Sequence, residues 1–193
     1  MKIAVIGYGG MGGYHVQNIR EYAATNPAYP IEVAGIYDTD PQRAEAAREK
    51  GLRAYASAED VFADAEVGAV LIATPNDVHA QYAYAAAQAG KHIICEKPIA
   101  MSVREAEKMY AAAQKAGVVL EVHQNRRWDD DFLTVGQLIK AGTIGQVYKI
   151  ESRVVGANGI PGAWRKERAH GGGMMLDWGV HLIDQMLQLV PSE

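Results

Sequence analysis

The sequence predicts an α/β protein built on a doubly wound parallel sheet, followed by the beginning of a second α/β domain. Short apolar runs rich in β-branched residues alternate with helix-like segments along the first two thirds of the 193-residue chain. Several runs are apolar at nearly every position, as expected of strands that are covered on both faces. A strand, a glycine-rich turn and a helix open the chain, and such alternation gives parallel strands with right-handed crossovers.

The first strand is predicted over Lys2–Ile6, and the helix after the turn over Tyr14–Ala24. The glycines between them have the G-x-G-x-x-G spacing, which permits a tight turn, close approach of a pyrophosphate and close helix packing. The phosphates would bind at the helix N-terminus, which makes this a Rossmann-type dinucleotide site. The alternative is a glycine-rich turn that binds nothing. The turn residues expected to line the dinucleotide are Gly7, Gly9, Gly10, Met11 and Gly12.

The second strand, Ile31–Tyr37, ends at Asp38. An acidic residue at this position accepts hydrogen bonds from the adenosine ribose and repels a 2′-phosphate, so Asp38 predicts NAD rather than NADP. The alternative is that Asp38 only begins a turn. Asp40 and Pro41 already supply the cap and first position of the next helix, which favours the ribose role.

Alternating elements continue to residue 123. We expect helices over Pro41–Lys50, after Ser57, up to Ala89 and from Ser102 to Ala116, and strands over Arg53–Ala56, Val67–Thr74, His92–Glu96 and Val118–His123. Ligands of doubly wound sheets bind outside the carboxyl ends of the strands. The polar residues and glycine that we expect at those ends are Gly7, Asp38, Asn76, Lys97 and Gln124.

The pattern changes near Trp128, and we expect two domains, 1–125 and 126–193. The second begins with a helix over Asp129–Ala141. The alternation over Gln146–Val155 then predicts a strand with one face in water. A helix over Met174–Leu189 follows, and it is apolar almost all round, which predicts burial.

Three polar residues of this last helix, Asp177, His181 and Asp184, fall at i, i+4 and i+7 and should share one face. The stripe is either the solvated side of a surface helix or part of a ligand site. In the second case Asp177 would orient His181 as a general base. A metal site is not expected, because no third His or Cys stands at ligand spacing.

Composition excludes several functional classes. The net charge of −4 gives no indication of the basic surface that nucleic-acid binding requires. No apolar run is long enough to span a membrane. The N-terminus lacks the features of a signal peptide, so a cytoplasmic location is expected. The single cysteine, Cys95, lies in an apolar run and is expected to be buried and inert.

Four motifs together resemble the Gfo/Idh/MocA family, named after glucose–fructose oxidoreductase, inositol dehydrogenase and rhizopine catabolism. They are Gly7-x-Gly9-x-x-Gly12, Ala73-Thr74-Pro75-Asn76-x-x-His79, Glu96-Lys97-Pro98 and Gly171-Gly172-Gly173-x-x-x-Asp177-x-Gly179-x-His181-x-x-Asp184. The resemblance implies an N-terminal Rossmann domain that binds NAD or NADP, with Thr74, Pro75, Asn76, His79, Glu96 and Lys97 beside the cofactor. It also implies a C-terminal α/β domain that completes the substrate site and forms homo-oligomers.

The resemblance further implies that Lys97, Asp177 and His181 are catalytic, with Arg126, Arg127 and Trp164 in the substrate pocket or in solvated and packing roles. Oxidation of a secondary alcohol of a sugar, cyclitol or related polyol would follow, with Lys97 polarising the oxygen or relaying its proton. The alternatives are a glycoside hydrolase that uses NAD transiently and a nucleotide-binding module without turnover. The family's second domain is longer, so we expect this one to be incomplete.

Overall fold

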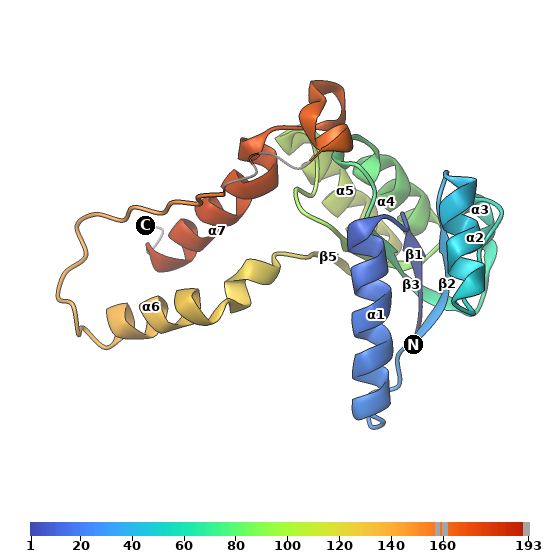
Figure 1. The fold of residues 1–193 in the computed structure, drawn as a ribbon, viewed down its shortest axis with the longest axis horizontal. Helices are drawn as coiled ribbons and strands as arrows, with labels where there is room; N and C mark the ends of the chain where they lie inside the picture. Colours follow the sequence, from blue (N-terminus) through green and yellow to red (C-terminus); the bar gives the residue numbers. More distant parts are fainter. Residues whose placement is uncertain (157–158, 160–161, 191–193) are drawn as a thin grey trace. The chain divides into compact units, whose positions relative to one another are not determined.

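The computed structural model describes residues 1–156, 159 and 162–190, which form two compact units, 1–122 and 123–193. Figure 1 shows the order of their elements along the chain. In the part of the chain that the structure describes, no helix is both long and apolar enough to cross a membrane.

Unit 1 contains a five-stranded, fully parallel sheet in the order β2-β1-β3-β4-β5, which confirms the predicted α/β fold class. The strands are β1 (Lys2–Ile6), β2 (Glu32–Tyr37), β3 (Val67–Ile72), β4 (His92–Cys95) and β5 (Leu120–Val122). The chain runs from β1 to β2 on one side and then crosses back to β3 on the other side of β1, so the sheet has a topological switch point between β1 and β3. Ligands of such sheets bind at this point, outside the carboxyl ends of the strands.

The helices of unit 1 lie on both faces of the sheet. They are α1 (Gly10–Thr25), α2 (Pro41–Glu49), α3 (Ala58–Ala63), α4 (His79–Gln88) and α5 (Val103–Ala116), with the 3₁₀ turn η1 (Asn76–Val78) before α4. Alternate residues of β1 point to opposite faces: Val5 packs with α1 and α2, and Ile6 packs with α3, α4 and α5. Two apolar cores, one on each face of the sheet, therefore hold the strands in place.

Local capping begins the helices where the sequence predicts them. The side chain of Ser57 accepts a hydrogen bond from the backbone N–H of Asp60, and that of Ser102 accepts one from Glu105. The strand expected over Arg53–Ala56 is reduced to a single parallel bridge between Ala54 and Ile36. Its pairing ends after two backbone hydrogen bonds because the chain turns into α3.

Unit 2 is built mainly from helices and short turns. They are η2 (Asn125–Trp128), α6 (Asp130–Lys140), η3 (Ala163–Lys166), η4 (Arg168–His170), the π-helical turn η5 (Met175–Gly179) and α7 (Val180–Leu189). The strand predicted over Gln146–Val155 is wrong: the described residues of this unit contain no strand that pairs with it. Alternation assigns side chains to faces, but a strand also needs hydrogen-bonding partners, and here Tyr148 and Val155 are more than 90% exposed.

The last helix also differs from the prediction. It begins with the wider π turn and continues as α7, and several of its apolar side chains are exposed, among them Met175, Ile183 and Leu187. Within unit 2, α7 contacts α6 and η2, while His181 on its polar side is only 4% exposed. The expected burial of the apolar surface is therefore wrong for these residues, and the polar side is the covered one.

Candidate functional site

The predicted cofactor residues of unit 1 follow the carboxyl ends of adjacent parallel strands. Gly7 follows β1, Asp38 follows β2, Thr74 lies two residues beyond β3, and Glu96 follows β4. Because parallel strands end at the same edge of a sheet, these residues share one edge, next to the switch point. Unit 1 therefore brings the glycine turn, the acidic residue Asp38 and Lys97 to the edge of the sheet formed by the carboxyl ends of its strands.

The glycine turn is closely packed against the backbone. Gly7 has φ +92°, and a Cβ on it would lie 2.7 Å from the carbonyl oxygen of Ala73; a Cβ on Gly12 would lie 1.9 Å from the carbonyl oxygen of Gly7. Gly10, by contrast, borders open space. Only glycine fits at Gly7 and Gly12, because both positions lack room for a side chain.

Helix α1 begins with donors that no side chain caps. Gly9 is its N-cap, no side-chain hydrogen bond closes this end, and its first turn, which includes Met11, carries no acidic residue. The free N–H groups and the positive end of the helix dipole suit a pyrophosphate. The residues present therefore fit the phosphates of a dinucleotide.

Asp38 holds the glycine turn in place. Its Oδ2 accepts the backbone N–H of Tyr8 at 2.7 Å, and its Oδ1 accepts that of Asp40 at 2.8 Å. Arg43 lies 3.2 Å from Oδ2 and is half-exposed, whereas the Asp38 side chain is only 4% exposed. The Asp38 carboxylate is therefore in contact with two backbone N–H groups and the Arg43 guanidinium, an arrangement that spacing alone did not reveal.

His79 links the loops that follow β3 and β4. Its Nδ1 lies 2.9 Å from the carbonyl oxygen of Pro98, and its Nε2 lies 3.1 Å from that of Thr74. The ring is fully buried, and Asn76 nearby is 4% exposed. Burial lowers the pKa of His79, although the two carbonyl contacts act in the opposite direction. In this arrangement the His79 ring supports Thr74 and Pro98 rather than presenting itself at the surface.

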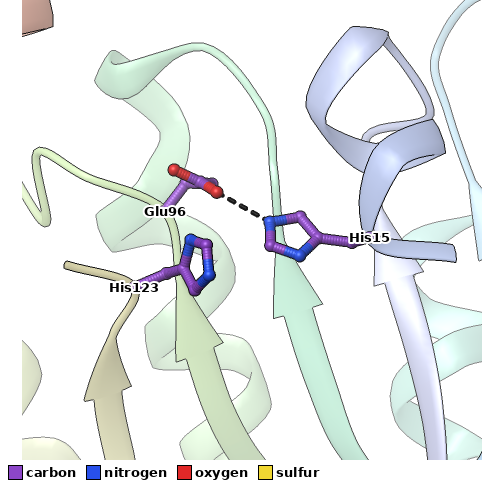
Figure 2. Close-up of side chains that lie close together, drawn as sticks. All are labelled: His15, Glu96 and His123. Atoms are coloured by element: carbon purple, nitrogen blue, oxygen red, sulfur yellow. Dashed lines mark hydrogen bonds and ion pairs between the residues drawn. The ribbon is translucent and has the colours of Figure 1, made fainter. Parts of the chain in front are cut away.

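Glu96 and Lys97 lie directly after β4. The carboxylate of Glu96 is buried and accepts the backbone N–H of Lys97 at 3.2 Å, and its other oxygen lies 2.7 Å from Nε2 of His15 (Figure 2). Lys97 itself is partly buried. The loop carrying Lys97 is thus held by side chains as well as by the sheet.

In unit 2, each member of the predicted polar stripe has its own polar contact. Asp184 accepts two hydrogen bonds from Arg127, at 2.8 and 2.6 Å. Asp177 lies 3.7 Å from Arg165. A bidentate pair of this kind is well suited to fixing a helix, so Arg127 is engaged with Asp184.

His181 is oriented by Gln124. The amide nitrogen of Gln124 donates to the carbonyl oxygen of Val180 at 3.4 Å, so its Oε1 faces Nδ1 of His181, at 3.0 Å. An amide oxygen only accepts, which places the proton on Nδ1 and leaves Nε2 of the neutral ring as the basic atom. A histidine held in this tautomer can take a proton from a hydroxyl group.

Two arginine–aromatic stacks flank these residues in unit 2. The guanidinium of Arg126 lies 4.2 Å from the ring centre of Trp178, and that of Arg165 lies 4.6 Å from the ring centre of Trp164. Such stacks hold a guanidinium plane in a fixed orientation. Trp164 therefore contacts Arg165, the same arginine that approaches Asp177.

The family models match both parts of the chain. Residues 1–124 match the model described as an oxidoreductase family with an NAD-binding Rossmann fold. The chain belongs to the Gfo/Idh/MocA family. Residues 132–193 match the C-terminal domain of the same family. The resemblance inferred from the four motifs is thereby confirmed, and unit 1 is an NAD-binding Rossmann domain.

Relatives of this family differ in substrate and cofactor. A solved NAD-binding protein from Listeria innocua is 50% identical, with a TM-score of 0.93 over 99% of this chain and 55% of that one. The 1,5-anhydro-D-fructose reductase of Ensifer adhaerens is 37% identical over 80% of this chain, and the NADP(+)-dependent scyllo-inositol 2-dehydrogenase of Bacillus subtilis is 35% identical over 68%. The chain spans 48% and 37% of the lengths of these two curated relatives.

Proposed function

We propose that the protein is an NAD-dependent dehydrogenase that oxidises a secondary alcohol of a sugar, cyclitol or related polyol. The observation that carries this proposal is the oriented His181, a base of defined tautomer, in a chain whose other unit is an NAD-binding Rossmann domain. The names of two relatives, a dehydrogenase of scyllo-inositol and a reductase of 1,5-anhydro-D-fructose, support a polyol-like substrate. Bound NAD would supply the hydride acceptor.

The roles of the chain's own residues follow from their chemistry. The Nε2 atom of His181 would take the hydroxyl proton, while Gln124 keeps the ring in the required tautomer. Lys97 would polarise the reacting oxygen or relay its proton, and Asp177 would tune the charge near the base together with Arg165. Arg127 would contribute to the substrate site by fixing Asp184, and Trp164 by fixing the guanidinium of Arg165.

The cofactor side of the proposal rests on unit 1. Gly7, Gly9 and Gly12 would admit the pyrophosphate, and Asp38 would accept hydrogen bonds from the ribose hydroxyls. The negative charge of Asp38 supports NAD over NADP. A cytoplasmic location and homo-oligomeric assembly complete the proposal; cell fractionation and light scattering test them.

Steady-state assays test the activity. The purified protein is mixed with NAD or NADP and a panel of inositols and aldoses, and NADH is followed by absorbance. Continuous NADH formation is expected; glycoside cleavage without net NADH, or cofactor binding alone, would contradict the proposal. The Lys97→Met and His181→Ala variants should abolish turnover and leave NAD affinity within about 3-fold. The exposed Lys108, changed to Met, serves as the matched control.

A further inference from the structure

His15, which has no role in the chemistry proposed above, forms a buried pair with Glu96. Nε2 of His15 lies 2.7 Å from Oε1 of Glu96 (Figure 2), and the two side chains are 8% and 7% exposed. An ionised carboxylate only accepts hydrogen bonds, so the imidazole donates from Nε2. The pair connects helix α1, one turn beyond the glycine turn, with the residue that follows β4.

Glu96 passes this connection on to Lys97. Its Oε2 accepts the backbone N–H of Lys97 at 3.2 Å. The backbone N–H of Glu96 donates to the carbonyl oxygen of Ile72 at 2.9 Å, which extends the pairing of β4 with β3. Because the main chain of Glu96 is held by the sheet, the hydrogen bond between its carboxylate and the Lys97 N–H is broken mainly by rotation of the Glu96 side chain. The hydrogen bond from His15 opposes that rotation.

Stability alone does not account for a polar pair at this place. The core on the α1 side of the sheet is otherwise largely aliphatic, with Val5, Val16 and Leu71 among its buried members. A buried hydrogen-bonded pair gives up its hydration, and replacing both partners by apolar groups of the same shape is often nearly neutral for stability. A pair that reaches the Lys97 backbone has a further use, because buried hydrogen bonds fix the direction of the groups that they join.

We propose that His15 is a positioning residue, which acts through the Glu96 carboxylate to hold Lys97 in its working position. This inference rests on the proposed function, because it assigns His15 to the lysine of that site. It also connects two parts of the proposed cofactor site. A residue of α1, the helix that begins at the glycine turn, would set the position of Lys97, which follows β4.

The test compares three variants. His15→Leu removes the donor at similar size, His15→Gln can place an amide N–H near the position of Nε2, and Gln17→Leu changes an exposed residue of the same helix as the matched control. Two properties are measured: the NMR signal of ¹³C-methylated Lys97, assigned with Lys97→Arg, and kcat and KM in the NAD-dependent assay. The NMR signal reports on Lys97 whether or not a substrate is turned over.

In His15→Leu, the Lys97 signal should shift and kcat should fall about 10- to 100-fold, as small displacements of a reacting group produce. The KM for NAD should stay within about 3-fold, and His15→Gln should recover most of both changes. An unchanged Lys97 signal and kcat in folded His15→Leu would overturn the inference, as would a His15→Gln variant that recovers neither.

If His15→Leu does not fold, Glu96→Gln replaces it in the comparison. It keeps the shape of the side chain and weakens both of its hydrogen bonds, so the Lys97 signal should move in this variant too; an unmoved signal would overturn the inference. A wild-type protein without turnover on any polyol would refute the proposed function, while the NMR comparison would still show whether His15 positions Lys97.

Discussion

The side-chain oxygen of Gln124 lies 3.0 Å from Nδ1 of His181, and the amide group of Gln124 is fixed in turn by the carbonyl oxygen of Val180. This contact sets the tautomer of the one buried histidine of α7. The helical spacing of the stripe assigned that task to Asp177, whereas the structure places the Nδ1 partner on a residue far away in the sequence. An uncharged group from a distant part of the sequence is thus one of the groups that orient the proposed base.

Removing that group should slow turnover and leave cofactor binding intact. Gln124→Leu deletes the acceptor but leaves the base in place, so we expect kcat to fall about 10- to 100-fold, less than most of the roughly 10²- to 10⁴-fold that a positioned base contributes. Gln124→Glu keeps an acceptor and adds a negative charge, which should raise the pKa of His181 and move the acidic limb of the pH profile upward. Profiles of kcat/KM for both variants test this, with the exposed Gln137→Leu as control; matching profiles for all three would contradict it.

Gly12→Ala should disrupt the glycine turn. The new Cβ would lie 1.9 Å from the carbonyl oxygen of Gly7, a backbone atom that cannot move without shifting the turn. We expect a loss of about 1–3 kcal/mol in the free energy of unfolding and much weaker NADH binding. Gly13→Ala is the control: a Cβ there meets nothing within 4 Å, and alanine favours the helix by about 0.5–1 kcal/mol. Urea unfolding and fluorescence titration with NADH measure both effects, and similar behaviour of the two variants would refute the argument.

Asp38→Ala should shift the cofactor preference toward NADP. The substitution removes the charge that repels a 2′-phosphate and leaves Arg43 without its Asp38 contact, so that the guanidinium can pair with the phosphate. We expect the ratio of the two dissociation constants to change about 10-fold or more, since one charge–charge contact is worth about 1.4 kcal/mol or more here. Calorimetry gives both constants, and Glu45→Ala on α2 is the control. An unchanged ratio would remove Asp38 from cofactor selection.

The protein should lose stability as the pH falls below neutrality, and His79 should account for part of the loss. Burial lowers the pKa of His79 below its unfolded value of 6.5, so the unfolded chain binds a proton more readily than the folded one. The contribution of His79 is therefore full above pH 6.5 and declines as the pH falls through and below that value. The difference between the urea midpoints at pH 7.5 and pH 5.5 should be smaller in His79→Gln than in wild type. In the control His170→Gln, at a partly exposed histidine, the wild-type difference should persist.

The parallel sheet could be predicted because its signals are local. The run Lys2–Ile6, the glycine spacing and the caps at Ser57 and Ser102 each specify a short segment, and the segments agree with one another. Prediction failed where an element depends on distant partners. The alternation over Gln146–Val155 describes two faces of a strand, yet no described neighbour pairs with it.

In the candidate site, too, local features could be predicted from the sequence, whereas contacts between distant residues could not. The position of Asp38 at the end of β2 could be read from the sequence, but the contact with Arg43 could not, because it depends on how α2 packs after the turn. The hydrogen bonds from His181 to Gln124 and from His15 to Glu96 join residues 57 and 81 positions apart. No periodicity encodes such distances, and the catalytic assignment of Lys97, Asp177 and His181 stays a prediction.

Cys95 gives the protein an internal probe of its own opening. It is the single cysteine of the sequence, has no exposed surface at the end of β4, and burial raises the pKa of its thiol. A thiol reagent can react only after this strand separates from its neighbours, since both access and the thiolate form are otherwise suppressed. The labelling rate of Cys95 thus reports how often the sheet opens two residues before Lys97, and a ligand that binds at this edge should slow that rate without any engineered label.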